Sequence, residues 1–266
     1  SDFFNTFFLW IFCSWRPIFV FSLDSLKSMF GFGSKLFIVS ITNSIFTNIY
    51  LVVIGKIFSP SFLGFYHRAE TFYKYPVVLI NSVVSQVSFP FFSKIQEDKA
   101  SLRFFLKAAI TNVTFITFPL MIGLIVVANP LIEIVLTEKW LPSVPYLQLF
   151  CLIGAVYPIH AINLNALNAL GRSDLFLKVD FINKAIIIVT IFISYRFGII
   201  TMIIGQIINS IIAFYLFSFH NGKLLNYPFL SQIRDIFPSL LISLTMGVLI
   251  FLLKFLNLEN QLLLLI

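Results

Sequence analysis

Long apolar stretches follow one another along most of the chain and constrain its fold more than any other feature. A helix needs about 20 apolar residues to cross the roughly 30 Å hydrocarbon core of a membrane. Seven stretches reach or approach that length, and an eighth begins at the end of the sequence. They do not alternate apolar and polar residues, as the strands of a membrane barrel would. The sequence therefore predicts an all-α integral membrane protein, a polytopic helical bundle, with spans at 33–54, 75–92, 105–128, 145–170, 175–195, 197–219 and 236–256 and a stub at 261–266.

The composition excludes a soluble domain and several classes of function. Only 11% of the residues are charged, against roughly 25% in soluble domains. The net charge is +7, but Lys and Arg are scattered singly, which argues against binding of nucleic acid. Cys13 and Cys151 are far apart and flanked by apolar residues, so neither a disulfide framework nor a metal site is implied. No soluble-enzyme motif and no long loop for a catalytic domain is present, so we expect a protein that is not an enzyme and needs no cofactor.

The placement of Lys and Arg predicts the orientation of the spans. Cytoplasmic connections carry an excess of these residues. They are more frequent before the first span and between spans two and three, four and five, and six and seven than in the other connections. We therefore expect the first set of connections to be cytoplasmic.

One stretch, "FLGFYHRAETFYKYPVVL" at 62–79, places Arg68, Glu70 and Lys74 among aromatic residues near the predicted outer surface. In one interpretation, residues 60–76 form an interfacial helix whose long side chains reach water beside an aromatic belt. In the other, the cations line a path for an anionic substrate. Both interpretations remain open on residue types alone.

Ionisable residues inside spans are costly and usually face a bundle interior or a wet cavity. Asp180 and Lys184 are four residues apart, so they share a helix face and are expected to pair. We expect this face to point inward, either as structural glue or as a site for substrate or ions.

A polar ladder marks the stretch "HAINLNALNALGR". His160, Asn163 and, less closely, Asn168 fall along one side of a helix. Asparagines often hydrogen-bond between membrane helices, whereas a lone histidine can serve in proton coupling. Gln86, Gln206 and Asn209 form a further group of polar residues, expected more for packing than for chemistry.

Four short strings follow one another along the chain: "LGFYHRA" at 63–69 followed by Pro76, "QVSFPFFSKIQED" at 86–98, "TEKWLPSVP" at 137–145 and "ALGRSD" at 169–174. In this order they resemble motifs of the polysaccharide-export flippases in the multidrug/oligosaccharidyl-lipid/polysaccharide exporter superfamily. The resemblance is closest to the Wzx-type (WzxC-like) lipopolysaccharide and exopolysaccharide translocases. Thr137 stands where the family pattern has glycine, and Phe65 stands where it has tyrosine.

The resemblance implies a place for this chain within a two-lobed transporter fold. Family members have two six-helix lobes around a central cavity, and this chain would be the second, C-terminal lobe. Residues 1–32 would be the end of the preceding helix and the cytoplasmic connection between lobes. Residues 33–219 would form the six-helix lobe, and residues 220–266 a cytoplasmic connection and truncated extra helices. Both ends of the sequence look cut, so we expect part of a larger protein.

The resemblance also implies a function in the bacterial inner membrane. The expected cargo is an oligosaccharide on undecaprenyl diphosphate, flipped from the cytoplasmic to the periplasmic leaflet by alternating access. Expected partners are this lipid-linked oligosaccharide, membrane lipid, the N-terminal lobe, and polysaccharide polymerase and export machinery. The alternatives are a drug/cation antiporter of the same superfamily and a non-transporting membrane scaffold. The candidate lining residues are Arg68, Lys74, Asp180 and Lys184, of which only Arg68 matches a quoted motif.

Overall fold

The computed structural model describes residues 4, 7–8, 10, 12 and 41–255. The chain forms two compact units, Ser1–Ile49 and Tyr50–Ile266. A helix runs over Ile41–Ile57. The second unit is built from helices, and no strand occurs in the described ranges. These helices are α3 (Pro60–Lys94), α4 (Lys99–Leu136), α5 (Val144–Ala169), α6 (Ser173–Ser194), α7 (Ile199–Leu225) and α8 (Phe229–Phe255), with the short 3-10 helices η1 (Glu138–Ser143) and η2 (Tyr195–Phe197).

Length and composition confirm a polytopic membrane protein. Five segments are long and apolar enough to cross a membrane: Pro60–Lys94, Lys99–Leu136, Glu138–Ala169, Ile199–Leu225 and Phe229–Leu252. The helix α6 has 22 residues and is not among the five, because Lys178, Asp180 and Lys184 interrupt its apolar character. The predicted first span is described only from residue 41 onward, as a shorter apolar helix, and the stub at 261–266 lies outside the described residues.

The helix α3 is longer than the predicted span at 75–92. It runs unbroken for 35 residues and contains Pro76 and Pro90. Residues 60–76 therefore continue directly into the span. At 1.5 Å per residue the helix is about 52 Å long, which exceeds the roughly 30 Å hydrocarbon core. One continuous helix thus carries Arg68, Glu70 and Lys74 and also forms the span.

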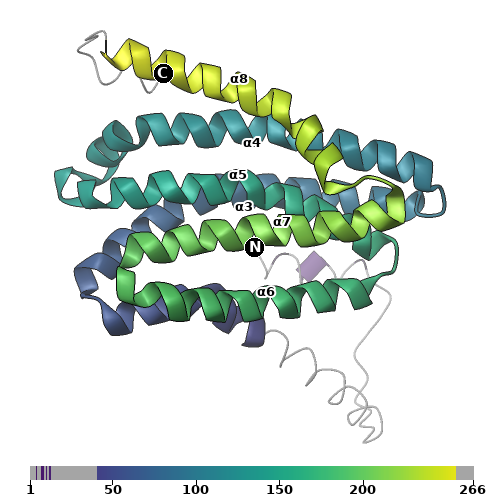
Figure 1. Ribbon diagram of the computed structural model, residues 1–266, viewed down its shortest axis with the longest axis horizontal. Coiled ribbons are helices and arrows are strands. Elements are labelled where there is room, and N and C mark those ends of the chain that lie inside the picture. The colour runs from purple at the N-terminus through teal and green to yellow at the C-terminus, as the bar shows by residue number, and fades with distance from the viewer. Residues whose placement is uncertain (1–3, 5–6, 9, 11, 13–40, 256–266) are drawn as a thin grey trace, which may run out of the picture. The chain divides into compact units, whose positions relative to one another are not determined.

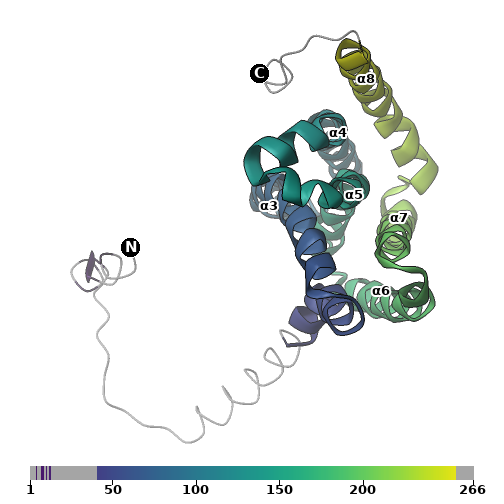
Figure 2. The same cartoon turned by 90° about the vertical axis from the view of Figure 1, so that its left-hand side faces the viewer.

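The helix α5 is the centre of the second unit. It packs against α3, α4 and α7, while α6 packs on α7 and α8 packs on α4. Figure 1 shows α4, α5, α7 and α6 side by side, and Figure 2 shows α3, α4 and α5 gathered together. The core between these helices is apolar and includes Leu106 and Ile110 of α4 and Ile159 and Ile162 of α5, all nearly or fully buried.

Two of the quoted motifs form turns between helices. In "ALGRSD", Gly171 has a φ of +69°, a left-handed conformation that glycine adopts at little cost. The N–H of Arg172 donates to the Leu167 carbonyl at 3.0 Å, and its guanidinium pairs with Asp174 at 2.9 Å. In "TEKW", Thr137 ends α4 with φ 80° and ψ 165°, a region used almost only by glycine. The backbone conformation at this position thus explains why the family pattern has glycine there.

Candidate functional site

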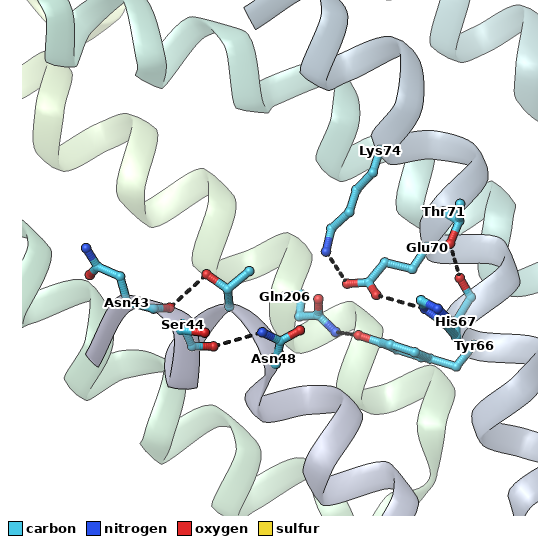
Figure 3. Close-up of polar contacts among 10 residues, drawn as sticks. Asn43, Ser44, Asn48, Tyr66, His67, Glu70, Thr71, Lys74 and Gln206 are labelled. Carbon is cyan, nitrogen blue, oxygen red and sulfur yellow. Dashed lines mark hydrogen bonds and ion pairs between the residues drawn. The ribbon is translucent and has the colours of Figure 1, made fainter. Parts of the chain in front are cut away.

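Three ionisable side chains of α3 form a polar group that we call the Glu70 cluster: His67, Glu70 and Lys74. The Nζ of Lys74 lies 2.7 Å from Oε1 of Glu70, and Nδ1 of His67 lies 3.9 Å from Oε2. The Glu70 side chain is 8% exposed, whereas Lys74 is 39% and His67 61% exposed. Figure 3 shows the lysine and histidine converging on the carboxylate. The cluster thus holds a buried anion beneath two more accessible groups.

Aromatic packing fixes the face of α3 beside this cluster. Tyr66 and Tyr73 both contact Phe150 of α5, with ring centroids 5.1 and 4.9 Å apart. The phenol of Tyr66 accepts a hydrogen bond of 2.9 Å from Nε2 of Gln206 on α7, as Figure 3 shows. A Cβ added at Gly154 of α5 would lie 3.2 Å from the Tyr73 ring. This face of α3 is therefore closely packed onto α5 and α7.

Arg68 contacts an aromatic ring outside the Glu70 cluster. Its guanidinium carbon lies 5.4 Å from the centre of the Trp140 ring in η1. Phe65 meets the same indole edge-on at 5.8 Å. The sequence placed Arg68 near Glu70 and Lys74, but in the structure Glu70 pairs with Lys74 and His67, whereas Arg68 lies over Trp140. A role for Arg68 toward a substrate stays a prediction.

The predicted pairing of Asp180 with Lys184 on α6 is confirmed. The Lys184 Nζ donates to Oδ2 of Asp180 at 2.7 Å, and the two side chains are 13% and 28% exposed. The pair is thus half-buried. Its role toward substrate or ions stays a prediction.

A polar contact also joins α6, α7 and the helix Ile41–Ile57. The Asn209 Nδ2 donates to the Tyr50 hydroxyl at 3.3 Å. The Thr190 hydroxyl donates to Oδ1 of Asn209 at 3.0 Å. Since Gln206 precedes Asn209 by one helical turn, one side of α7 binds polar groups of α3, α6 and Tyr50.

Asn163 belongs to a buried set of side chains that we call the amide network: Asn163, Ser218, Asn221 and Gln232. All four are 0% exposed. The Nδ2 of Asn163 donates to Oε1 of Gln232 at 2.9 Å, and Nδ2 of Asn221 donates to Oδ1 of Asn163 at 2.8 Å. These bonds connect α5, α7 and α8, as expected for asparagine acting between helices.

An ion pair continues the amide network to α4. Gln232 also donates to the Tyr227 carbonyl at 3.3 Å, and the Tyr227 hydroxyl donates to Asp235 at 2.8 Å. Asp235 pairs with Lys107 of α4 at 2.7 Å. Tyr227 lies between α7 and α8, and its burial, followed by the neighbouring Asp235, raises the pKa of its phenol. The contacts fasten the start of α8 to three other helices.

The remaining predicted residues lie apart from one another. His160 sits between Tyr157 and Phe217, with ring centroids 4.5 and 6.1 Å away, and its Nδ1 has no hydrogen-bond partner within the described part of the chain. Asn168 is half-buried at the end of α5, and the side chain of Gln86 is exposed. In the described ranges, no three His, Cys, Asp or Glu side chains gather as metal ligands would.

Several partners of the predicted site residues could not be identified from the sequence alone. Trp140, Asn221 and Gln232 were not singled out, and Gln206 was treated as packing. All four contact residues that are distant in the sequence. The motif "TEKW" was the one available signal, and it marked Trp140 only as part of a pattern.

Comparison with known proteins identifies relatives of one kind. Residues 1–145 match the family described as "Polysaccharide biosynthesis protein". The chain is 34% identical over 161 residues to the teichuronic acid biosynthesis protein TuaB of Bacillus subtilis, which covers 60% of this chain and 33% of TuaB. It is 32% identical over 206 residues to the lipopolysaccharide biosynthesis protein WzxC of Escherichia coli, which covers 76% of this chain and 42% of WzxC. The chain thus spans well under half the length of these relatives.

A solved structure shares the fold. The lipid II flippase MurJ in its inward closed conformation superposes with a TM-score of 0.78 at 22% identity. The match covers 98% of this chain and 55% of MurJ. At this identity the likeness concerns the fold alone, and it confirms the predicted all-α helical fold.

Proposed function

This chain belongs to the polysaccharide biosynthesis protein family, and from that premise we propose that it forms part of a flippase for lipid-linked oligosaccharide. The names of WzxC and TuaB refer to biosynthesis of lipopolysaccharide and teichuronic acid. MurJ is a lipid II flippase. These likenesses support a transporter in preference to an enzyme. The proposed location is the bacterial inner membrane.

The observation that carries the proposal is the pair of ion pairs on long helices, Glu70–Lys74 on α3 and Asp180–Lys184 on α6. Charges within membrane segments usually face a bundle interior or a wet cavity. A diphosphate and sugar hydroxyls need such a polar surface, while a prenyl tail stays in lipid. Lys74 is the more exposed cation of the two pairs, so it is the first candidate to meet a diphosphate.

The cargo would be an oligosaccharide on undecaprenyl diphosphate, moved from the cytoplasmic to the periplasmic leaflet. Alternating access requires a second lobe that rocks against this one around a site near the membrane midplane. The N-terminal lobe of the same protein is the proposed partner, with polysaccharide polymerase and export machinery downstream. Arg68 differs from Lys74, Asp180 and Lys184 because its guanidinium already lies over an aromatic ring.

Deletion of the gene in its host tests the proposal. We expect complete lipid-linked oligosaccharide units to accumulate and surface polysaccharide to be lost. Normal polysaccharide with altered sensitivity to cationic drugs would refute the proposal and favour the antiporter. Unchanged polysaccharide and unchanged drug sensitivity would favour a scaffold.

A variant series tests the cationic role of Lys74. Lys74→Met alone removes the nearest partner of the buried Glu70 carboxylate, and breaking one side of a buried ion pair destabilises a protein. The double variant Glu70→Gln, Lys74→Met removes both charges and should accumulate normally in the membrane while losing translocation. Lys99→Met, at an exposed position at the start of α4, is the matched control. Full translocation by the double variant would remove Lys74 from the proposed path.

A further inference from the structure

Trp140 lies in η1, between α4 and α5. Its backbone N–H donates to the Thr137 carbonyl at 3.1 Å, and the Ser143 hydroxyl donates to its backbone carbonyl at 2.6 Å. These bonds order the backbone that carries Trp140, and its side chain is half-buried. The connection between α4 and α5 therefore places an aromatic ring beside the neighbouring helix α3.

Three residues from the first turns of α3 meet that surface. A Cβ added at Gly64 would lie 3.7 Å from the Trp140 ring. Phe65 contacts the ring edge-on, and Arg68 lies over it. Residues four apart share one face of a helix, so Gly64 and Arg68 hold the same side of α3 against Trp140.

The side of α3 that faces away from Trp140 carries the packed tyrosines and Glu70. Tyr66 and Tyr73 lie against Phe150, and Glu70 pairs with Lys74 and His67. At 100° per residue, Tyr66, Glu70 and Tyr73 lie about 120–180° round the helix from Gly64 and Arg68, and His67 and Lys74 lie between the two sides. Contacts on both sides thus determine the rotation of α3 about its axis, and with it the direction of the Lys74 ammonium.

We propose that Arg68 is a positioning residue that acts through Trp140, and that Trp140 sets the orientation in which α3 presents the Glu70 cluster to the cargo. The inference rests on the proposed function for the cargo, but the contact itself stands on the geometry above. It also assigns a task to two of the four motifs, since "LGFYHRA" and "TEKW" supply the two sides of one contact. Arg68 then needs no direct contact with a diphosphate.

A double-variant cycle in the host's own gene tests the proposal. Arg68→Gln and Trp140→Leu should each lower translocation about two- to fivefold, the range expected for an exposed cation–π contact. Because both substitutions remove the same contact, translocation by the double variant should be no slower than translocation by the slower of the two single variants. Arg68→Lys and Trp140→Tyr keep a cation and a ring and should keep most of the activity. Arg196→Gln, which removes a similar contact with Tyr195 at 5.5 Å, is the control and should have no effect.

Two outcomes would overturn the positioning role. One is multiplied losses in the double variant, and the other is loss of transport in Arg68→Gln with none in Trp140→Leu. Either result would mean that Arg68 acts on the cargo independently of Trp140.

A second readout does not depend on any cargo. Val77 of α3 is 3% exposed, so a Val77→Cys thiol should react slowly with a maleimide when Cys13 and Cys151 are replaced. Its reaction should quicken in Arg68→Gln and Trp140→Leu but not in Arg68→Lys. Unchanged reactivity in all variants would refute the positioning role. Changed reactivity without any transport of lipid-linked oligosaccharide would refute the proposed function instead.

Discussion

Replacement of Gln232 by leucine tests how strongly the amide network stabilises the helical unit. The side chain makes four hydrogen bonds. Its Oε1 accepts from Asn163 at 2.9 Å and from Ser218 at 2.9 Å. Its Nε2 donates to Oδ1 of Asn163 at 3.1 Å and to the Tyr227 carbonyl at 3.3 Å. Leucine fills a similar volume but removes all four bonds.

The loss is partly offset because Asn163 has other partners. Its Nδ2 also donates to the Ile159 carbonyl, and its Oδ1 also accepts from Asn221. The Ser218 hydroxyl and the Tyr227 carbonyl lose their Gln232 partner. Interhelical hydrogen bonds in membrane proteins average about 0.6 kcal/mol, so loss of four bonds should lower the free energy of unfolding by about 2–3 kcal/mol. In a unit of this size, such a loss lowers the melting temperature by about 4–12 °C.

The buried thiol of Cys151 supplies the assay. It is 0% exposed, so in a Cys13→Ser background a thiol-reactive dye labels the protein only as it unfolds. Gln148→Leu, which removes one hydrogen bond to the Ile125 carbonyl, should lower the melting temperature by about a quarter as much. Gln86→Leu, at an exposed position, should leave it unchanged. Equal melting temperatures for Gln232→Leu and Gln86→Leu would refute the reasoning.

Three further predictions follow from local geometry. Thr137→Gly should raise stability by about 1–2 kcal/mol in the same melting assay, because it relieves a positive-φ conformation at the cost of glycine's greater freedom; a lower melting temperature would contradict this. Lys74→Met should destabilise the protein more than Glu70→Gln does, because the first removes the 2.7 Å partner of a buried carboxylate and leaves it only His67 at 3.9 Å, whereas the second leaves a more exposed lysine; the reverse order of melting temperatures would be inconsistent with the geometry. The Ser101 side chain and backbone lower the pKa of Asp98, which caps α4, so its stabilising effect is present above the ordinary pKa and is lost as pH falls through the lowered one. Asp98→Ala should therefore differ from the unmodified protein at neutral pH and converge with it in strong acid, and a constant difference in melting temperature would refute this.

The helices and one ion pair were predictable from the sequence because both depend on local spacing. Apolar length predicted the spans, and a separation of four residues predicted the contact of Asp180 with Lys184. The boundary of α3 was not predictable in the same way. Apolar length placed the start of the span near Tyr75, but α3 begins at Pro60 and runs through Pro76. Tyr73 and Val77, on either side of this proline, both lie close to Gly154 of α5, a contact that apolar length does not reveal.

Contacts between helices could not be predicted from the sequence, because periodicity gives the buried face of a helix but not the neighbouring helix that covers it. Asn163 binds Gln232 and Asn221, which lie 69 and 58 residues away. The proximity of Arg68 to Glu70 in sequence suggested one cationic group, but the arginine lies over Trp140. Each of these contacts depends on how α5, α7 and η1 pack against α3 and α8.

The most direct test of the central claim measures the leaflet that holds the lipid-linked oligosaccharide. Membrane vesicles from the host, with and without the gene, would be treated with an impermeant reagent that modifies sugars exposed on the outer face. In inside-out vesicles from the host that carries the gene, we expect the oligosaccharide to be transferred to the protected interior. In vesicles from the deletion strain, we expect the sugars to stay exposed to the reagent. The same protected fraction with and without the gene would contradict the account.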